Sequence, residues 1–331
     1  MDKLRVGVVG LGNMGKNHVR NYAQIHGASL VAVCDVSHDL ATSFASEYHC
    51  QGFTSLEEMV ATCPLDALSI TVPTVHHYSV ASFLIQKGLH VLVEKPIADT
   101  VSHATSLVNL AEQHRVVLMV GHIERFNPAV QKLKSIITEG TLGKITSLIA
   151  KRVGAFPAQI KDANVIIDLA VHDIHIFSYL LDQQPSDVYG KAGSALAQGR
   201  EDYAELFLSY GDQHGLIQVN WITPIRIRNL AVTGTKGYIE LNYMTQELVL
   251  YESNYSQDFD TFGDYIIKFG LPNRQEIRLE KREPLQEELL HFLTCIRTKT
   301  TPVVSGENGI RALETALQVM KKMGFGESKK G

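Results

Sequence analysis

The 331-residue chain has few cysteines and no long apolar run. Its four cysteines show no C-x-x-C spacing, so they give no support to a structural zinc site or a disulfide framework. No apolar run approaches the length that a membrane span needs. No signal peptide fits the N-terminus, because residues 6–9 form a strand-length run that opens a glycine motif. These absences predict a soluble, cytoplasmic protein without a membrane partner.

Neither positive nor negative charge dominates the sequence. The chain has 31 basic and 35 acidic residues, a net charge of −4, and no block of like charges before the terminal Lys329 and Lys330. This argues against nucleic acid as a partner. With 45% hydrophobic and 20% charged residues, the composition is that of a globular protein, long enough for two domains.

A glycine motif follows the first predicted strand, residues 4–9. Gly10, Gly12 and Gly15 match G-x-G-x-x-G, and helical sequence begins directly after them. In that context the first glycine permits a tight turn, the second lets the backbone approach a pyrophosphate, and the third allows close helix–strand contact. We expect Asn13 and Met14, between the glycines, to contact the dinucleotide as well. The motif alone also fits a glycine-rich turn of another α/β protein.

The next predicted strand, residues 30–34, ends at Asp35, which lies 20 residues beyond Gly15. An acid in this position accepts hydrogen bonds from ribose hydroxyls and repels a 2′-phosphate. No Lys or Arg occurs between residues 36 and 47. The sequence therefore predicts a dinucleotide cofactor, NAD rather than NADP.

The alternation of strand-like and helical segments continues to residue 122. Strands at 67–72, 90–93 and 116–120 alternate with helices at 56–61, 78–87 and 101–114, which predicts an N-terminal Rossmann domain (1–122) with a six-stranded, doubly wound parallel sheet. Ligands in such folds lie beyond the carboxyl ends of the strands. The polar or small residues just past those ends are Asp35, Thr74, His77, Glu94, Lys95, Gly121 and His122. Lys95 by itself would be read as a solvated lysine, but beside a nicotinamide it becomes a catalytic candidate.

The second half, residues 123–331, has the pattern of an α+β domain for substrate binding and oligomerisation. Strand-like segments between 144 and 252 predict a large, open, mainly antiparallel sheet with helices on one face, closed by helices at 284–296 and 309–323. Residues 253–273 lack a clear period and predict an irregular excursion. Because the other face of the sheet would be exposed in a monomer, we expect a homodimer or homotetramer paired through it.

A predicted helix at residues 165–175 is apolar on nearly every side, so its polar residues are expected inside the protein. Asp168, His172 and His175 share an arc of roughly 60° on this helix. Three interpretations fit these residues: a structural Asp–His pair, a metal site, or an acid/base site in which the carboxylate orients an imidazole. A charged lysine and a hydride-accepting cofactor nearby disfavour the metal site.

The triplet Glu94–Lys95–Pro96, together with Asp168-x-x-x-His172, resembles the glucose–fructose oxidoreductase, inositol dehydrogenase and MocA-like oxidoreductase family over nearly the whole chain. The resemblance implies an NAD-dependent sugar dehydrogenase in which Lys95, Asp168 and His172 line the substrate site and face the nicotinamide. The P-x-x-x-H turn of the family matches Pro73 and His77, which implies that His77 binds the cofactor and that Thr74 lies near the nicotinamide ribose. His175 stands where family members often have an acid, which leaves its role as a substrate contact less well supported.

Within the family, residues 121–128, 151–157, 219–224 and 232–237 resemble the UDP-N-acetylglucosamine 3-dehydrogenase subgroup. This implies oxidation at C3 to a 3-keto sugar nucleotide, which an aminotransferase on the way to lipid A precursors would consume. Arg125, Lys151 and Arg152 are then candidate diphosphate ligands, although each also reads as a solvated charge. The alternatives are a UDP-sugar acid, a free polyol such as inositol, and a non-catalytic NAD-binding regulator. A regulator would not need Lys95, Asp168 and His172 together.

Overall fold

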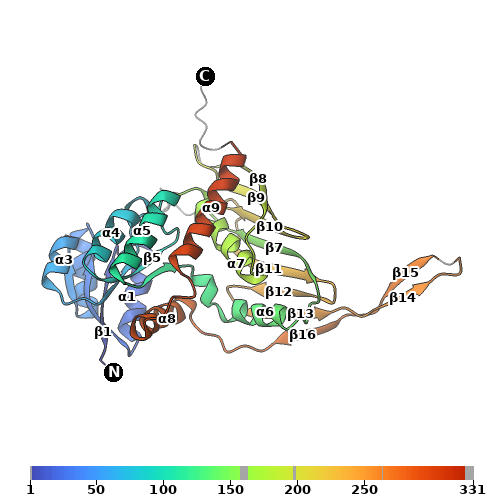
Figure 1. Ribbon diagram of the computed structural model, residues 1–331, viewed down its shortest axis with the longest axis horizontal. Helices are drawn as coiled ribbons and strands as arrows, with labels where there is room; N and C mark the ends of the chain where they lie inside the picture. Colours follow the sequence, from blue (N-terminus) through green and yellow to red (C-terminus); the bar gives the residue numbers. More distant parts are fainter. Residues whose placement is uncertain (1, 157–162, 197–198, 263, 325–331) are drawn as a thin grey trace, which may run out of the picture. The chain divides into compact units, whose positions relative to one another are not determined.

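The computed structural model describes residues 2–156, 163–196, 199–262 and 264–324 (Figure 1). The chain forms two compact units. Unit 1 comprises Met1–Phe126 and Arg282–Glu314, and unit 2 comprises Asn127–Lys281 and Thr315–Gly331. The sequence predicts that all residues from 123 to 331 form one second domain. The structure instead returns a C-terminal segment to unit 1, because helix α8 (Pro284–Thr298) buries its apolar face there against α1 (Gly15–Gln24).

Unit 1 contains the predicted parallel sheet. Its strand order is β3-β2-β1-β4-β5-β6, with β1 at the point where the order reverses. The strands are β1 (Leu4–Val9), β2 (Ala28–Cys34), β3 (Gln51–Phe53), β4 (Ala67–Ile70), β5 (His90–Glu94) and β6 (Leu118–Gly121). The periodicity did not locate β3, because this strand has only three residues and its first two are exposed.

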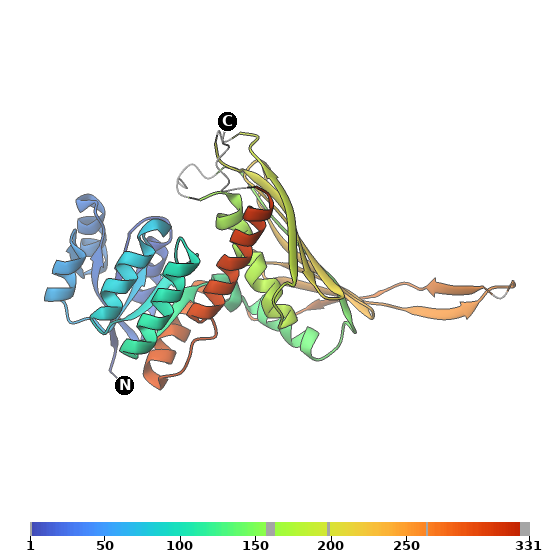
Figure 2. The same cartoon turned by 45° about the horizontal axis from the view of Figure 1, so that its top comes forward.

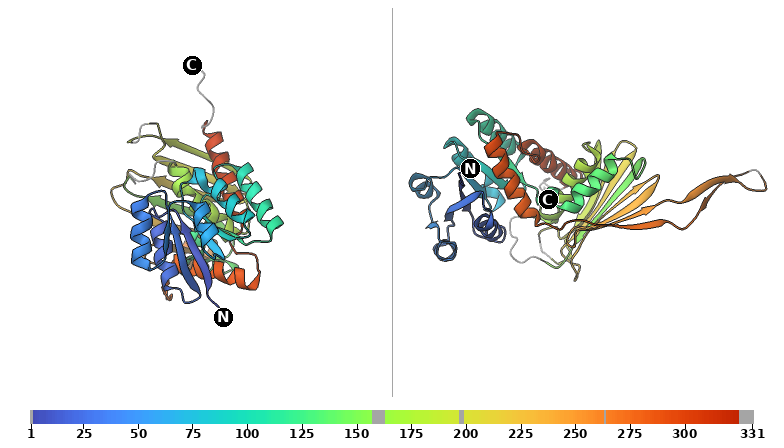
Figure 3. Two further views of the ribbon diagram at one scale, coloured as in Figure 1. Left: turned by 90° about the vertical axis from the view of Figure 1, so that its left-hand side faces the viewer. Right: turned by 90° about the horizontal axis from the view of Figure 1, so that it is seen from below.

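The strands of this sheet are apolar on both faces. Residues such as Val8, Ile70 and Leu92 are completely buried, which is the pattern of a parallel sheet covered on both sides. The covering helices can be followed in the left panel of Figure 3. They are α1, α2 (His38–Tyr48), α3 (Leu56–Thr62), α4 (His77–Gln86) and α5 (Val101–His114), joined by α8.

Unit 2 contains an eight-stranded sheet of order β16-β13-β12-β11-β7-β10-β9-β8. All neighbours pair antiparallel except β7 and β10, which confirms the predicted mainly antiparallel sheet. The strands are β7 (Ile145–Val153), β8 (Asp187–Gly193), β9 (Tyr203–Tyr210), β10 (Gln213–Asn220), β11 (Ile227–Gly234), β12 (Gly237–Asn242), β13 (Glu247–Glu252) and β16 (Asn273–Ile277).

Helices cover one face of this sheet. The helices α6 (Pro128–Thr138) and α7 (Val171–Leu181), with the C-terminal part of α9 (Gly306–Lys322), lie on the same side (Figure 2). Alternation along β9 is typical, with Ala204, Leu206 and Leu208 buried toward the helices. On the opposite face, Ile149 and Leu216 are exposed large apolar residues.

The region predicted as an irregular excursion is a hairpin instead. Strands β14 (Tyr255–Phe259) and β15 (Tyr265–Phe269) pair antiparallel and form a separate two-stranded sheet. The hairpin extends beyond the rest of unit 2 (Figure 1). Its period was hidden because the sequence mixes aromatic and polar residues on both strands, and only the pairing shows which side chains share a face.

In the part of the chain that the structure describes, no helix has the length and apolar character that crossing a membrane would require.

Candidate functional site

The glycine loop at the end of β1 has the geometry predicted for it. Gly10 has a φ of +89°, and a Cβ at Gly15 would lie 1.9 Å from the carbonyl oxygen of Gly10. These two glycines are required by the backbone of the loop itself. A Cβ at Gly12 would instead meet no described atom within 4 Å. The space beside Gly12 is therefore open, as a close approach to a pyrophosphate requires.

Helix α1 begins directly after this loop. The residue before its first turn, Met14, makes no side-chain capping bond with any described residue, and the first turn contains no acid. The positive end of the helix dipole favours an anion here. Thr71 holds the loop from the neighbouring strand, because its hydroxyl donates to the carbonyl oxygens of Val9 (3.0 Å) and Gly10 (2.5 Å).

Asp35 lies at the end of β2 and is bound to the same loop. Its Oδ2 accepts the backbone N–H of Leu11 at 2.7 Å, and its Oδ1 accepts that of Ser37 at 2.8 Å. Each carboxylate oxygen can accept a further hydrogen bond. The loop is thus pinned to an acid that still has acceptor capacity for ribose hydroxyls.

His77 has a role different from the direct cofactor contact that we expected. It is buried, and its Nδ1 and Nε2 lie 2.8 Å and 2.9 Å from the carbonyl oxygens of Pro96 and Val72. A neutral imidazole can donate to only one of two carbonyls. His77 therefore braces the turn that follows Lys95 against the end of β4. Thr74, at the start of the short helix η1 (Thr74–His76), is half-buried.

Glu94 is likewise buried behind Lys95 rather than presented to a ligand. Its Oε1 lies 3.0 Å from Nε2 of His18, and its Oε2 accepts the backbone N–H of Lys95 at 3.2 Å. A Cβ at Gly121 would lie 3.0 Å from the same carboxyl group. Glu94 thus fixes the backbone of Lys95, whose own side chain is half-buried. The sequence analysis did not identify His18, although its position three residues after Gly15 indicated that it lies close to the glycine loop.

A second buried carboxyl, Glu288 on α8, lies near Glu94. Neither of its oxygens has a hydrogen-bond partner among the described residues. Burial raises the pKa of Glu288 well above the ordinary glutamate value, and the negative charge of Glu94 raises it further. The protonated form of Glu288 is therefore favoured over a wider range of pH than that of an exposed glutamate. Nothing in its local sequence indicated this, because Glu94 lies 194 residues away.

In unit 2, the predicted helix at 165–175 begins irregularly. Residues Ile166–Ala170 form a π-helical turn, η3, and α7 follows at once. Asn164 caps this start, since its Oδ1 accepts the N–H groups of Ile166 and Ile167, both at 3.1 Å. π-Turns within helices are frequent at functional sites, and Asp168 lies in this one.

Asp168 is bound to an aromatic surface that the sequence analysis did not identify. Its Oδ2 accepts the indole N–H of Trp221 at 3.3 Å. Phe156 packs edge-on against Trp221 with ring centroids 5.6 Å apart, and the Arg200 guanidinium lies 5.3 Å from the Trp221 ring centroid. His172 on α7 is half-buried. We call Phe156, Trp221 and Arg200 the aromatic wall.

His175 is buried, one helical turn beyond His172. Within the described residues, no three His, Cys, Asp or Glu side chains form a group that could hold a metal ion.

Arg152 differs from the expected diphosphate ligand. Its side chain points to the buried face of β7, and its Nε and Nη2 donate to Asp173 at 2.7 Å and 3.0 Å. Tyr243 completes this arrangement, with its hydroxyl 3.2 Å from Asp173 and its ring beneath the guanidinium. The reason is alternation along the strand: Lys151 faces outward, so Arg152 faces the core. Asp173, beside His172 in sequence, was overlooked.

Another arginine of unit 2 is better placed for an anion. Arg228 is partly exposed, and it donates to the carbonyl oxygens of Val153 (2.6 Å) and Ile227 (2.9 Å). Burial, together with the positive charges of Arg152 and Arg226, lowers the pKa of Arg228 to about 10. A bound anion would relieve this repulsion. Arg125, the remaining predicted ligand, lies in the short helix η2 (Ile123–Phe126) of unit 1.

Known families match both units. Residues 4–122 match the oxidoreductase family with an NAD-binding Rossmann fold, GFO_IDH_MocA, and residues 130–240 match the GFO/IDH/MocA C-terminal domain. The chain belongs to the Gfo/Idh/MocA oxidoreductase family. The predicted resemblance is confirmed, and the chain is an oxidoreductase whose relatives act on sugars and polyols.

Individual relatives cover almost the entire chain. The UDP-N-acetylglucosamine 3-dehydrogenase of Acidithiobacillus ferrooxidans is 29% identical over 96% of this chain and 97% of its own length. A solved structure of that enzyme aligns with a TM-score of 0.85 at 27% identity, covering 98% of this chain and 99% of the other. The scyllo-inositol 2-dehydrogenase (NAD(+)) of Bacillus subtilis is 26% identical over 95% of this chain and 92% of its length.

The glycine geometry predicts two different defects. Gly12→Val places a side chain in open space, so the melting temperature should stay within about 2 °C of the parent, whereas dinucleotide binding should weaken at least about tenfold. Gly15→Val forces its Cβ against the Gly10 carbonyl and should lower the melting temperature markedly. Calorimetry and titration of protein fluorescence with NAD measure both effects. Equal losses of stability in the two variants would contradict this assignment.

The raised pKa of Glu288 predicts a pH dependence of stability. Since its folded-state pKa is raised, the unfolded chain releases this proton at a lower pH than the folded chain. The contribution of protonated Glu288 to the free energy of unfolding is fully present below the ordinary glutamate pKa. This contribution is lost as the pH rises toward the raised pKa. Glu288→Gln removes this loss, so the melting temperature of the variant minus that of the parent should increase as the pH rises above the ordinary glutamate pKa. Glu314→Gln, at an exposed site of unit 1, is the control and should show a constant difference.

Proposed function

We propose that this oxidoreductase oxidises the C3 hydroxyl of UDP-N-acetylglucosamine with NAD, producing a 3-keto sugar nucleotide. The observation that carries the proposal is the aromatic wall beside Asp168. Trp221 binds the carboxylate of a candidate catalytic residue, and its neighbours Phe156 and Arg200 provide a ring surface and a cation. A nucleotide diphosphate has a planar base and an anionic group for such a surface, whereas a free polyol has neither.

The chemistry requires that a hydroxyl lose a proton and its carbon lose a hydride. In the proposed mechanism His172 accepts the proton, since an imidazole suits general-base catalysis near neutral pH. Asp168 orients the imidazole, and Lys95 hydrogen-bonds to the reacting oxygen. Lys95 is the alternative base. The backbone of Lys95 is held by Glu94 and its turn by His77, which keeps the ammonium group in a defined place.

The cofactor would be held by the loop of unit 1. Gly10, Gly12, Asn13, Met14 and Gly15 would surround the pyrophosphate at the start of α1. Asp35 would accept the adenosine ribose hydroxyls, and Thr74 would lie at the nicotinamide ribose, with His77, Glu94 and Lys95 behind it. When bound, NAD supplies the hydride acceptor.

For the diphosphate we propose Arg200 and Arg228 in place of Arg152, whose guanidinium is committed to Asp173. Arg125 and His175 stay in the proposal as further substrate contacts. A free polyol such as inositol is the second candidate, supported by the inositol dehydrogenase among the relatives. A UDP-sugar acid would use the same nucleotide contacts. A non-catalytic NAD-binding regulator is the candidate of another class.

We further propose that the enzyme works in the cytoplasm as a homodimer or homotetramer paired through the open face of the unit 2 sheet. A 3-keto sugar can accept the amino group of an amino-acid donor by transamination, so an aminotransferase would consume the product.

The cofactor prediction concerns Asp35. Turnover should be far greater with NAD than with NADP, because the carboxylate repels a 2′-phosphate. Asp35→Ser should bring the two kcat/KM values closer together. Asp39→Ser, at an exposed position on α2, serves as the control and should leave the ratio unchanged. Equal turnover of both cofactors by the parent protein would refute the assignment.

The substrate prediction compares NADH formation with UDP-N-acetylglucosamine, free N-acetylglucosamine and myo-inositol. The nucleotide sugar should have the largest kcat/KM. Arg200→Ala should raise its KM at least about tenfold, as expected for loss of one charged contact, with kcat little changed. His172→Ala should lower kcat by ~10²-fold or more and leave NAD binding intact.

These variants separate the candidate functions. If free sugar or inositol turns over as well as the nucleotide sugar, the proposed substrate is wrong. If His172→Ala retains full activity, His172 is structural. If NAD binds and none of the three compounds is oxidised, the regulator becomes the favoured candidate.

A further inference from the structure

Unit 1 contains two buried carboxyl groups that come from different elements. Glu94 is the last residue of β5 and is 7% exposed, whereas Glu288 lies on α8 and is fully buried. The two are close enough for the charge of Glu94 to act on Glu288. Helix α8 packs against α1, the helix that begins at the glycine loop (Figure 1). We call Glu94 and Glu288 the carboxyl pair.

The two members of the carboxyl pair have different surroundings. Glu94 lies 3.0 Å from Nε2 of His18 and accepts the backbone N–H of Lys95 at 3.2 Å, and two such donors stabilise a carboxylate ion. Glu288 has neither a hydrogen-bond partner nor an ion-pair partner among the described residues. An ionised carboxyl group in these surroundings is costly. A single negative charge, located on Glu94, is therefore favoured for the pair.

The contacts of His18 fit a neutral imidazole. His18 is completely buried, and its Nδ1 has no hydrogen-bond partner among the described residues. An imidazole that donates to Glu94 through Nε2 leaves only a lone pair on Nδ1. A protonated imidazole would instead bury an N–H group without an acceptor from these residues, which costs more. The negative charge of Glu94 is then not cancelled by His18.

The position of Glu94 brings this charge to the edge of the sheet where a dinucleotide binds. Ligands of such folds lie beyond the carboxyl ends of the strands, and Glu94 ends β5, with β4 between it and the β1 strand of the glycine loop. In the function proposed above, on which this inference rests, the nicotinamide lies beside Lys95. The oxidised nicotinamide ring is a cation and the reduced ring is neutral. A buried negative charge behind Lys95 therefore favours the oxidised form.

We propose that the carboxyl pair carries one negative charge in total, on Glu94, and that this charge makes the cofactor site bind NAD⁺ in preference to NADH. Glu288 contributes a dipole next to the Glu94 ion rather than a second charge. In the oxidation of a hydroxyl, the preference favours loading of the hydride acceptor and release of the reduced cofactor. A unit charge about 10 Å away, at an effective dielectric constant of about 20, changes a binding constant roughly tenfold.

The experiment measures the dissociation constants of NAD⁺ and NADH by calorimetric titration of the full chain, without any sugar. The quantity compared is the constant for NADH divided by that for NAD⁺, in which a general weakening of dinucleotide binding cancels. Glu94→Gln removes the charge and should lower this ratio roughly tenfold, which raises the reduction potential of the bound cofactor by about 30 mV. Glu94→Asp keeps the charge and should keep the ratio within about threefold of the parent.

Glu288→Gln distinguishes one charge from two. Because Glu288 carries no charge in the proposed pair, its replacement by an amide of the same shape should leave the ratio within about threefold of the parent. A loss as large as that of Glu94→Gln would place a charge on Glu288 and overturn the proposal. So would an unchanged ratio in a folded Glu94→Gln variant.

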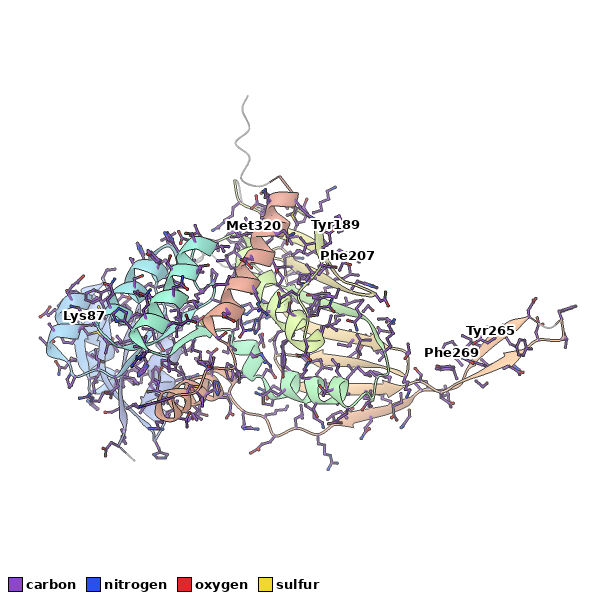
Figure 4. All side chains as sticks on the ribbon, viewed as in Figure 1. Lys87, Tyr189, Phe207, Tyr265, Phe269 and Met320 are labelled. Atoms are coloured by element: carbon purple, nitrogen blue, oxygen red, sulfur yellow. The ribbon has the colours of Figure 1, made fainter. Side chains whose placement is uncertain are left out.

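Two exposed charges of unit 1 serve as controls for the removal of a charge. Glu112→Gln makes the same chemical change on the surface of α5. Lys87, labelled in Figure 4, is exposed just before β5, whereas Glu94 ends that strand. Both Glu112→Gln and Lys87→Gln should keep the parent's ratio. A tenfold fall in either control would show that the ratio does not report the charge of Glu94.

A measurement on the parent protein covers the case in which Glu94→Gln does not fold. Benzamide adenine dinucleotide has the shape of NAD⁺ but an uncharged ring, and the parent should bind NAD⁺ roughly tenfold more tightly than this isostere. Equal dissociation constants would refute the preference for a cation and leave the proposed sugar oxidation intact. If the parent binds no dinucleotide at all, the proposed cofactor site fails together with the carboxyl pair.

Discussion

The buried carboxylate of Glu94 holds together the part of unit 1 that bears the cofactor loop and Lys95. It contacts His18 on α1, fixes the backbone of Lys95, and packs against Gly121 at the end of β6. Glu288 on α8, whose pKa is raised by burial, lies near it. Because a lone buried charge is costly, the elements around Glu94 cannot be exchanged independently.

In unit 2, a buried ion pair likewise holds separate elements together. Arg152 on β7 and Asp173 on α7 form a bidentate pair covered by Tyr243, which joins the helix to the sheet at one register. Removing one partner of such a pair costs about 3–5 kcal/mol. Asp168 and His172, on the same stretch of helix, are thereby held in place while their own side chains stay partly exposed. The rigidity of the proposed site thus comes from a pair that has no part in the chemistry.

Much of the site was predictable because its indications are local. Gly10, Gly12, Gly15 and Asp35 act through backbone conformation and strand ends, which short sequence patterns encode directly. The contacts that residues make with distant partners were not predictable. Arg152 pairs with Asp173, and His77 lies between two carbonyl groups from different loops, and no local sequence pattern encodes either contact. The hairpin was missed because only the cross-strand pairing determines which of its side chains share a face.

The sequence by itself determined the two sheets, the dinucleotide loop and the family, since periodicity, glycine spacing and strand-end acids depend on neighbours in the chain. The tertiary structure alone decided which charges are buried together, that the pKa of Glu288 is raised, that Trp221 binds Asp168, and that α8 belongs to unit 1. The physical reason is that desolvation and pairing depend on what surrounds a side chain in space. For these residues the decisive neighbours lie 21 to 194 positions away along the chain.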